Sequence, residues 1–91
     1  MFVLIRLDGT TEPVFRADLL GVYETIDDAR ESMRKDVGGV VWRITKRDAL
    51  GDDYEVKRYL MGAHVFLHEL FWQWIIFDSD EPHEWNSMLS W

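Results

Sequence analysis

The chain has no cysteine, and that single absence excludes several kinds of chemistry. Without a thiol there can be no disulfide framework, no zinc–thiolate site and no cysteine nucleophile. A cysteine-free chain fits a reducing compartment, so we expect a cytoplasmic protein.

Long apolar runs are also lacking, and the first residues do not show a leader pattern. The longest apolar stretch lies within residues 64–77, contains His68 and Glu69, and falls short of the roughly 18 apolar residues of a membrane span. The first residues, Met1 to Arg6, carry no basic region ahead of their apolar side chains and no small-residue cleavage site. We therefore expect neither a membrane segment nor a signal peptide.

Positive charge is scarce relative to negative charge. The 91 residues include 10 lysines and arginines against 17 aspartates and glutamates, a net charge of −7. Such a charge disfavours non-specific binding to nucleic acid and favours basic protein surfaces, although it would also serve solubility alone. With 47% hydrophobic residues the chain is rich enough in apolar side chains for one ordered domain, which we expect to span 1–91.

Apolar, β-branched and aromatic runs predict a mainly antiparallel sheet. The expected strands are 2–7, 19–24, 40–46, 54–60 and one or two within 64–77. A reversal inside the last segment would fall near His68-Glu69, where glycine, asparagine and proline are absent. For 40–46 a helix extending to Leu50 is the alternative.

One helix is predicted over 26–37. Thr25 is a suitable N-cap with Asp28 three residues on, and Gly38-Gly39 would end the helix. Its apolar stripe would consist of Ile26, Ala29, Met33 and Val37. The expected fold class is thus α+β, a sheet packed on this helix, with a short C-terminal helical segment from Pro82.

No catalytic motif is present. The serines have no nucleophile-elbow sequence around them, and no phosphate-loop lysine follows Gly38-Gly39. We therefore predict a protein that is not an enzyme and needs no cofactor. The third-ranked alternative is a small metal-dependent enzyme: His64 and His68 would share a strand face, with Glu69 or His83 as a further ligand.

Acidic clusters and C-terminal aromatic residues are the predicted partner-binding groups. Carboxylates spaced on a rigid body can imitate DNA phosphates and occupy the basic cleft of a nucleic-acid-handling protein, without the chain itself binding nucleic acid. Apolar residues at the C-terminus could dock on the domain or form a homodimer. The predicted partner-binding residues are Asp52, Asp53, Asp78, Asp80, Glu81, Glu84, Trp85 and Trp91.

Five tryptophans leave single-strand stacking as a further alternative, since aromatic platforms bind bases beside a basic groove. The basic groups at 43–47 and 57–58 would share one face if 40–46 and 54–60 paired as a hairpin. The molecule would then have one basic and one acidic face. Most of the tryptophans are nevertheless expected in the core.

Two segments, GVYETIDDARESMRKDV and the later WQWIIFD, carry a family resemblance. The pattern resembles small proteins of bacteria and their phages, in which a strand ending in Gly-Val-aromatic leads into a helix and a late W-x-I-F strand closes the sheet. The resemblance covers Gly21–Val37 and Trp72–Asp78 and implies a phage or bacterial accessory protein, which would act in the host cytoplasm if phage-encoded. In general character such proteins are similar to anti-CRISPR and other anti-defence inhibitors, and the resemblance maps no catalytic residue.

The sequence thus predicts a non-enzymatic acidic binding protein. The expected activity is inhibition of a host nucleic-acid-handling or defence complex through an acidic surface. A homo-oligomeric interaction module without nucleic-acid mimicry is the alternative.

Overall fold

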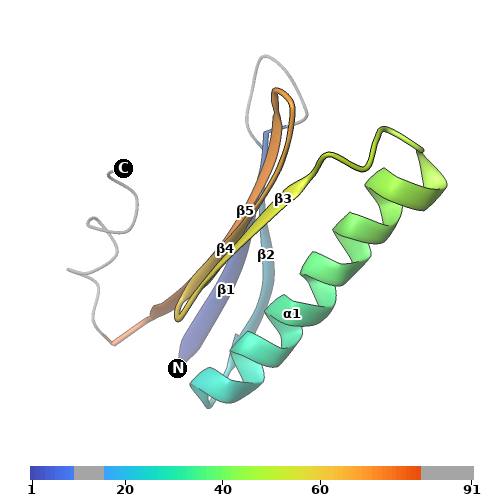
Figure 1. Ribbon diagram of the computed structural model, residues 1–91. Helices are drawn as coiled ribbons and strands as arrows, with labels where there is room; N and C mark the ends of the chain where they lie inside the picture. The colour runs from blue at the N-terminus through green and yellow to red at the C-terminus, as the bar shows by residue number, and fades with distance from the viewer. Residues whose placement is uncertain (10–15, 81–91) are drawn as a thin grey trace.

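The computed structural model describes residues 1–9 and 16–80, and these form one five-stranded antiparallel sheet with a helix on one face (Figure 1). The strand order is β2-β1-β5-β4-β3. This confirms the predicted α+β class. The elements are β1 (Phe2–Asp8), β2 (Arg16–Tyr23), α1 (Ile26–Trp42), the π-helical turn η1 (Arg43–Arg47), β3 (Glu55–Tyr59), β4 (Gly62–Leu67) and β5 (Leu70–Asp78).

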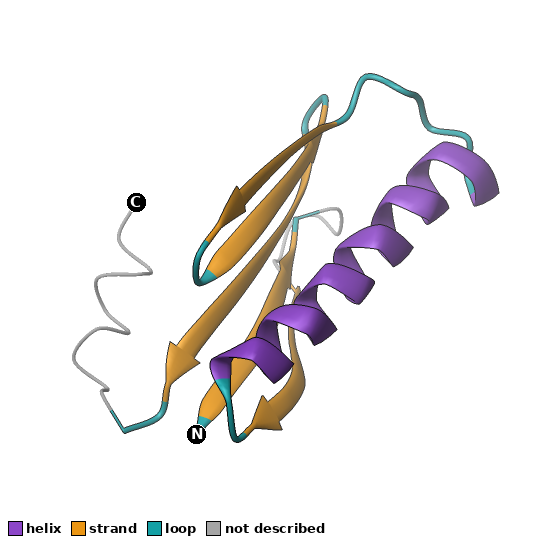
Figure 2. Ribbon diagram, turned by 60° about the horizontal axis from the view of Figure 1, so that its bottom comes forward, coloured by secondary structure: helices purple, strands orange, loops and turns teal. Residues whose placement is uncertain are grey.

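Figure 2 shows α1 lying along one face of the sheet, and the core lies between the two. Side chains alternate along each strand, so one set from each strand contributes to the core. Leu4 of β1 pairs with Ile76 of β5, and both are fully buried. Trp74 is paired with Ala63 of β4 and is 1% exposed. The apolar stretch 64–77 is therefore the centre of the sheet, because β5 lies between β1 and β4.

The helix begins where the sequence predicts, but it does not end there. The Thr25 hydroxyl accepts a hydrogen bond from the Asp28 backbone N–H at 3.1 Å, which is the expected N-cap. Yet α1 continues through Gly38-Gly39 to Trp42, and η1 extends it to Arg47. The prediction of a strand over 40–46 is wrong, and so is its pairing with 54–60.

The physical reason for the longer helix is burial. Val37, Val40 and Ile44 continue the apolar stripe at helical spacing, and each is at most 2% exposed. Each glycine costs a helix about 1 kcal/mol relative to alanine. Burying two aliphatic side chains against the sheet gains about 1.5–3 kcal/mol per side chain, which outweighs that cost.

Replacing both glycines by alanine should stabilise the protein. A Cβ at Gly38 or Gly39 would meet no atom within 4 Å. The free energy of unfolding of the double variant Gly38→Ala/Gly39→Ala should therefore be about 1–2 kcal/mol higher, and its Tm in a thermal melt should also be higher. Gly62→Ala is the control, because its Cβ would lie 2.6 Å from the Trp74 carbonyl oxygen and should destabilise. A less stable double variant would contradict a helix through this segment.

The segment 64–77 forms two strands, and the chain reverses at His68-Glu69. His68 takes a φ of 55°, in the left-handed region. The turn thus forms without glycine or asparagine, because the pairing of β4 with β5 on both sides of it fixes the reversal. In the second strand, β2 starts at Arg16 rather than at residue 19, and pairs antiparallel with β1 as expected.

The predicted C-terminal helical segment lies outside the described residues, as do Glu81, Glu84, Trp85 and Trp91. No helix among residues 1–9 and 16–80 is long and apolar enough to cross a membrane.

Candidate binding surfaces

A polar network joins α1 to the sheet at the centre of the fold. The Asp36 carboxylate accepts a hydrogen bond from the Trp74 Nε1 at 2.7 Å and one from the Arg6 Nη1 at 2.8 Å. Arg6 also donates to Asp18 on β2 at 3.2 Å, and Arg16 donates to the same carboxylate. One carboxylate thus ties the helix to strands β1 and β5.

Hydrogen bonds and charges within this network stabilise the charged forms of Asp18 and Arg6. Desolvation alone would raise the pKa of Asp18, but hydrogen bonds from Arg16 and Arg6 outweigh it and hold that pKa below its ordinary value. Desolvation likewise opposes the charge on Arg6, yet the hydrogen bond to Asp36 keeps the pKa of Arg6 raised. The Arg6 Nε is buried and has no hydrogen-bond partner within the described part of the chain. The network has a structural role, fastening the helix to the sheet.

The side of the sheet opposite α1, here called the helix-free face, is largely apolar over β2, β1 and the second half of β5. Because Leu4 points into the core, its neighbours Val3, Ile5 and Leu7 point to the helix-free face. The strand register aligns them in cross-strand rows: Val22–Val3–Phe77, Leu19–Ile5–Ile75 and Ala17–Leu7–Gln73. Leu19 and Val22 at the β2 edge are 66% and 51% exposed, whereas Ile75 in the middle of the sheet is 2% exposed. Val3, Ile5 and Phe77 are half-buried.

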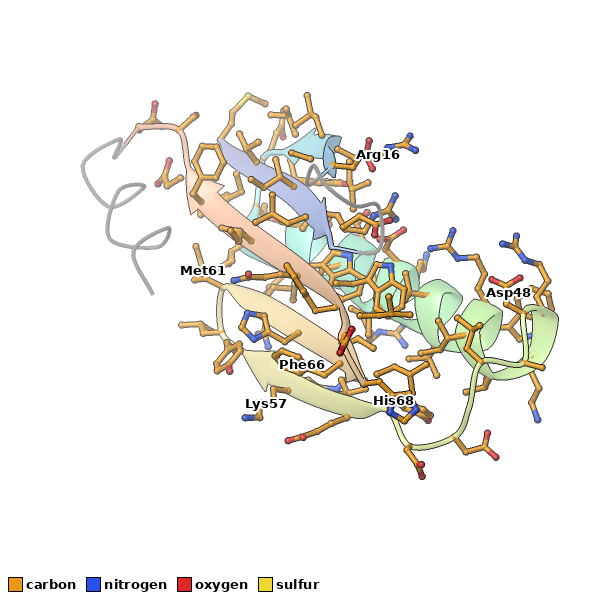
Figure 3. The ribbon with its side chains drawn as sticks, turned by 90° about the horizontal axis from the view of Figure 1, so that it is seen from above. Arg16, Asp48, Lys57, Met61, Phe66 and His68 are labelled. Carbon is orange, nitrogen blue, oxygen red and sulfur yellow. The ribbon has the colours of Figure 1, made fainter. Side chains whose placement is uncertain are left out.

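The other half of this face mixes rings with polar groups. His64 contacts the rings of Tyr59 and Phe66, with centroids 5.4 and 5.3 Å apart. Lys57 lies 6.0 Å from the Phe66 ring centroid, and Figure 3 shows both on the side away from α1. Burial lowers the pKa of His64, and the nearby Lys57 charge lowers it further. A hydrogen bond with Gln73 acts in the opposite direction but does not outweigh these two effects.

The predicted acidic residues fall at two ends of the sheet. Asp52 and Asp53 are exposed and precede β3, whose first residue, Glu55, pairs with Phe66 near the β4–β5 turn. Asp78 ends β5 opposite Phe2. Since β5 has nine residues, about 3.3 Å each, the two groups are separated by roughly 25–30 Å. The fold does not unite them in one patch.

Asp78 and Asp80 also have partners within the chain. The Met1 amino group lies 3.7 Å from the Asp78 Oδ1 and 3.3 Å from the Asp80 Oδ2. The Asp80 backbone N–H donates to the Asp78 Oδ1 at 2.9 Å. Part of their charge is therefore already neutralised at this end of the sheet.

The two histidines do not converge. His64 sits in β4 among rings, and His68 is in the turn after β4. In residues 1–9 and 16–80 no group of three or more histidine, cysteine, aspartate or glutamate side chains is placed to hold a metal ion. His83 lies outside these ranges.

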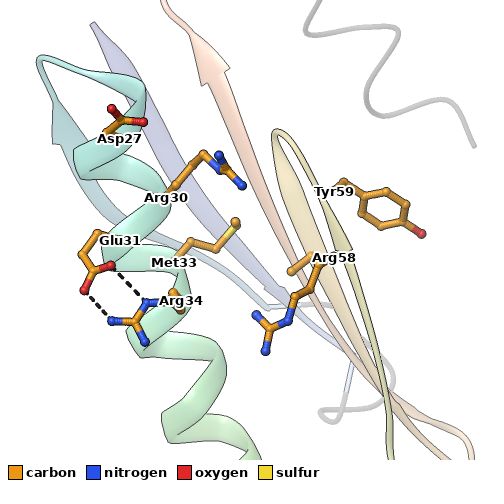
Figure 4. Close-up of a pocket in the computed structure, with 8 residues that line it drawn as sticks. Asp27, Arg30, Glu31, Met33, Arg34, Arg58 and Tyr59 are labelled. Atoms are coloured by element: carbon orange, nitrogen blue, oxygen red, sulfur yellow. Dashed lines mark hydrogen bonds and ion pairs between the residues drawn. The ribbon is translucent and has the colours of Figure 1, made fainter.

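A groove between α1 and the β3–β4 hairpin collects arginines (Figure 4). It has a volume of about 320 Å³ and is lined by Asp27, Arg30, Glu31, Met33, Arg34, Arg58, Tyr59 and Ala63. No sequence motif predicts this site. Arg30 and Arg58 are far apart in the chain, and the hairpin considered for 40–46 with 54–60 would have grouped Arg58 with the basic residues at 43–47.

Comparison with known protein families, with curated proteins and with solved structures gave no match. The resemblance to small bacterial and phage proteins stays a prediction.

Proposed function

We propose that this chain is a non-enzymatic protein-binding module that docks through its helix-free face. The observation that carries the proposal is the pair of apolar rows Val22–Val3–Phe77 and Leu19–Ile5–Ile75. Their members on the β2 edge, Leu19 and Val22, are exposed. A two-layer domain commonly turns a polar sheet face to water, and a contiguous apolar patch on a monomer is typical of interaction sites.

The acidic excess supports a partner of basic character. A net charge of −7 raises the association rate with a basic protein surface, and the apolar rows would supply most of the affinity. The proposed partner is thus a protein with an apolar patch inside a basic surface, as nucleic-acid-handling proteins carry. Inhibition of such a host complex is part of this proposal. The separation of Asp52-Asp53 from Asp78 and Asp80 favours apolar docking with acidic steering over mimicry of one phosphate row.

A homodimer through the same face is the second candidate. The apolar rows are supported for this role by their position: they reach the edge strand β2, where Leu19 and Val22 are exposed. Two such faces could pack as a sandwich with about 10 Å between sheets.

The double variant Leu19→Ser/Val22→Ser tests the proposal against a matched control. Leu60 is also 66% exposed, but it lies in the β3–β4 turn, so Leu60→Ser matches the Leu19→Ser half of the double variant at a position elsewhere. A partner captured from a host and then purified should bind the double variant at least about tenfold more weakly than the unchanged chain. The same partner should bind Leu60→Ser with an unchanged Kd. Equal affinity for the double variant and the control would contradict the helix-free face as the contact surface.

The molar mass in solution distinguishes the homodimer from a monomer that binds another protein. Light scattering of the isolated chain should give 10.8 kDa if the face is free for a partner. Twice that mass, reverting to a monomer in Leu19→Ser/Val22→Ser but not in Leu60→Ser, would establish the homodimer instead.

A further inference from the structure

The groove between α1 and the β3–β4 hairpin brings together arginines without matching carboxylates. Figure 4 shows the side chains of Arg30 and Arg58 extending into it from opposite walls, one from the helix and one from β3. Within the described residues neither forms a hydrogen bond or an ion pair. In a chain with seven more acidic than basic residues, two unpaired arginines facing one groove are unexpected.

The remaining charges of the groove do not compensate them. Arg34 donates to both carboxylate oxygens of Glu31, at 3.0 and 2.6 Å, so this pair is already satisfied. The same bonds lower the pKa of Glu31. Asp27 lines the groove at the helix start and makes no ion pair with Arg30 or Arg58. Elsewhere on the helix, Arg47 is paired with Asp48 at 3.1 Å, whereas the side chain of Arg43 forms no hydrogen bond or ion pair among the described residues.

The base of the groove is apolar. Met33 and Ala63 are buried, at 7% and 1% exposed, and they belong to the core. Tyr59 points away from the helix in Figure 4, so it does not close the space. A volume of about 320 Å³ is at the lower end of small-molecule sites. The site thus has two cationic walls over an apolar base.

We propose that this groove binds a small phosphate monoester, with Arg30 and Arg58 holding the phosphate and the organic part lying over Met33 and Ala63. A guanidinium presents a planar fork of donors that matches an oxyanion in a bidentate manner. A carboxylate has two oxygens and is satisfied by one such fork, whereas the three terminal oxygens of a phosphate monoester can accept from two forks at once. The groove lies between α1 and β3, and its walls are formed by Arg30 and Arg58, away from the exposed Leu19 and Val22 of the helix-free face.

The test is a titration of the full chain followed by amide chemical shifts, at low ionic strength. The probes are adenosine monophosphate, inorganic phosphate and adenosine. Adenosine monophosphate should give saturable shifts at residues around 30, 58 and 63. Inorganic phosphate should shift the same residues with lower affinity. Adenosine should cause no saturable shifts. Arg30→Gln and Arg58→Gln should each weaken adenosine monophosphate binding about tenfold or more, since each removes a charge-assisted contact.

Lys57→Gln is the matched control, because it removes a positive charge one residue from Arg58 on the opposite face of the same strand. It should bind adenosine monophosphate as the unchanged chain does. Equal weakening in Lys57→Gln would show a diffuse charge effect and overturn the proposal. Absence of saturable shifts would also overturn it. Arg30 and Arg58 are exposed, and circular dichroism of each variant verifies that the fold is kept.

Discussion

Asp36→Asn should lower the free energy of unfolding by about 2–3 kcal/mol. The substitution keeps the shape of the side chain but removes the charge that faces Arg6 at 2.8 Å, and it weakens the acceptor for Trp74. The side chains of Arg6 and Asp36 are 18% and 29% exposed, so the loss should be smaller than the 3–5 kcal/mol typical of fully buried pairs. Urea unfolding with an unchanged m-value measures it.

Asp48→Asn is the control for that experiment. Asp48 is also paired with an arginine, but its partner Arg47 is 57% exposed, so the loss should stay under about 1 kcal/mol. A double-mutant cycle with Trp74→Phe removes the indole donor while keeping a ring. The two losses should add to more than the loss in the double variant, because both break the same hydrogen bond. Equal losses in Asp36→Asn and Asp48→Asn would show that the network does not fasten the helix.

Ile44→Ala should destabilise the protein by about 2–4 kcal/mol, whereas Trp42→Ala should change stability by under about 1 kcal/mol. Ile44 is 2% exposed in the core, and the larger Trp42 is 56% exposed on the outer side of the helix. The expected order is thus the reverse of the order of side-chain size. In a strand, residues 42 and 44 would lie on the same face and respond alike.

Chemical unfolding of both variants decides between the two conformations. Similar losses for Ile44→Ala and Trp42→Ala would restore the strand that the sequence predicts for 40–46. A large loss confined to Ile44 fits the helix that runs through Gly38-Gly39.

Local sequence signals were sufficient where local physics decides. Thr25 placed the helix start, and Ala29, Met33 and Val37 are buried as their spacing predicted, whereas Ile26 is half-buried. The strands β1 and β5 followed from their apolar content. These features depend on capping bonds and on side-chain periodicity, which act over a few residues.

The segment 40–46 shows where such signals fail. Val40, Val41 and Ile44 are β-branched, and a glycine pair precedes them, so propensity predicted a helix end followed by a strand. Propensity differences of about 1 kcal/mol per residue are smaller than the gain from burying Val40 and Ile44 against a sheet. That gain exists only once the sheet is in place.

The candidate sites depend on the fold in the same way. Acidic residues were evident in the sequence, but their distribution over two ends of the sheet follows from strand order and register. In the polar network, Asp36 bonds to Arg6, which is 30 positions earlier in the chain, and to Trp74, which is 38 positions later. The arginine groove likewise joins a helix to a strand of a later hairpin.

The sequence by itself determined the acidic charge, the absence of thiol chemistry, the α+β class and the start of the helix. Only the tertiary structure decided how far the helix extends, which face of the sheet the helix covers and which arginines meet in one groove. The physical reason is the separation along the chain over which each effect acts. Charge, capping and periodicity are properties of short segments, whereas burial and the convergence of side chains arise when distant segments pack together.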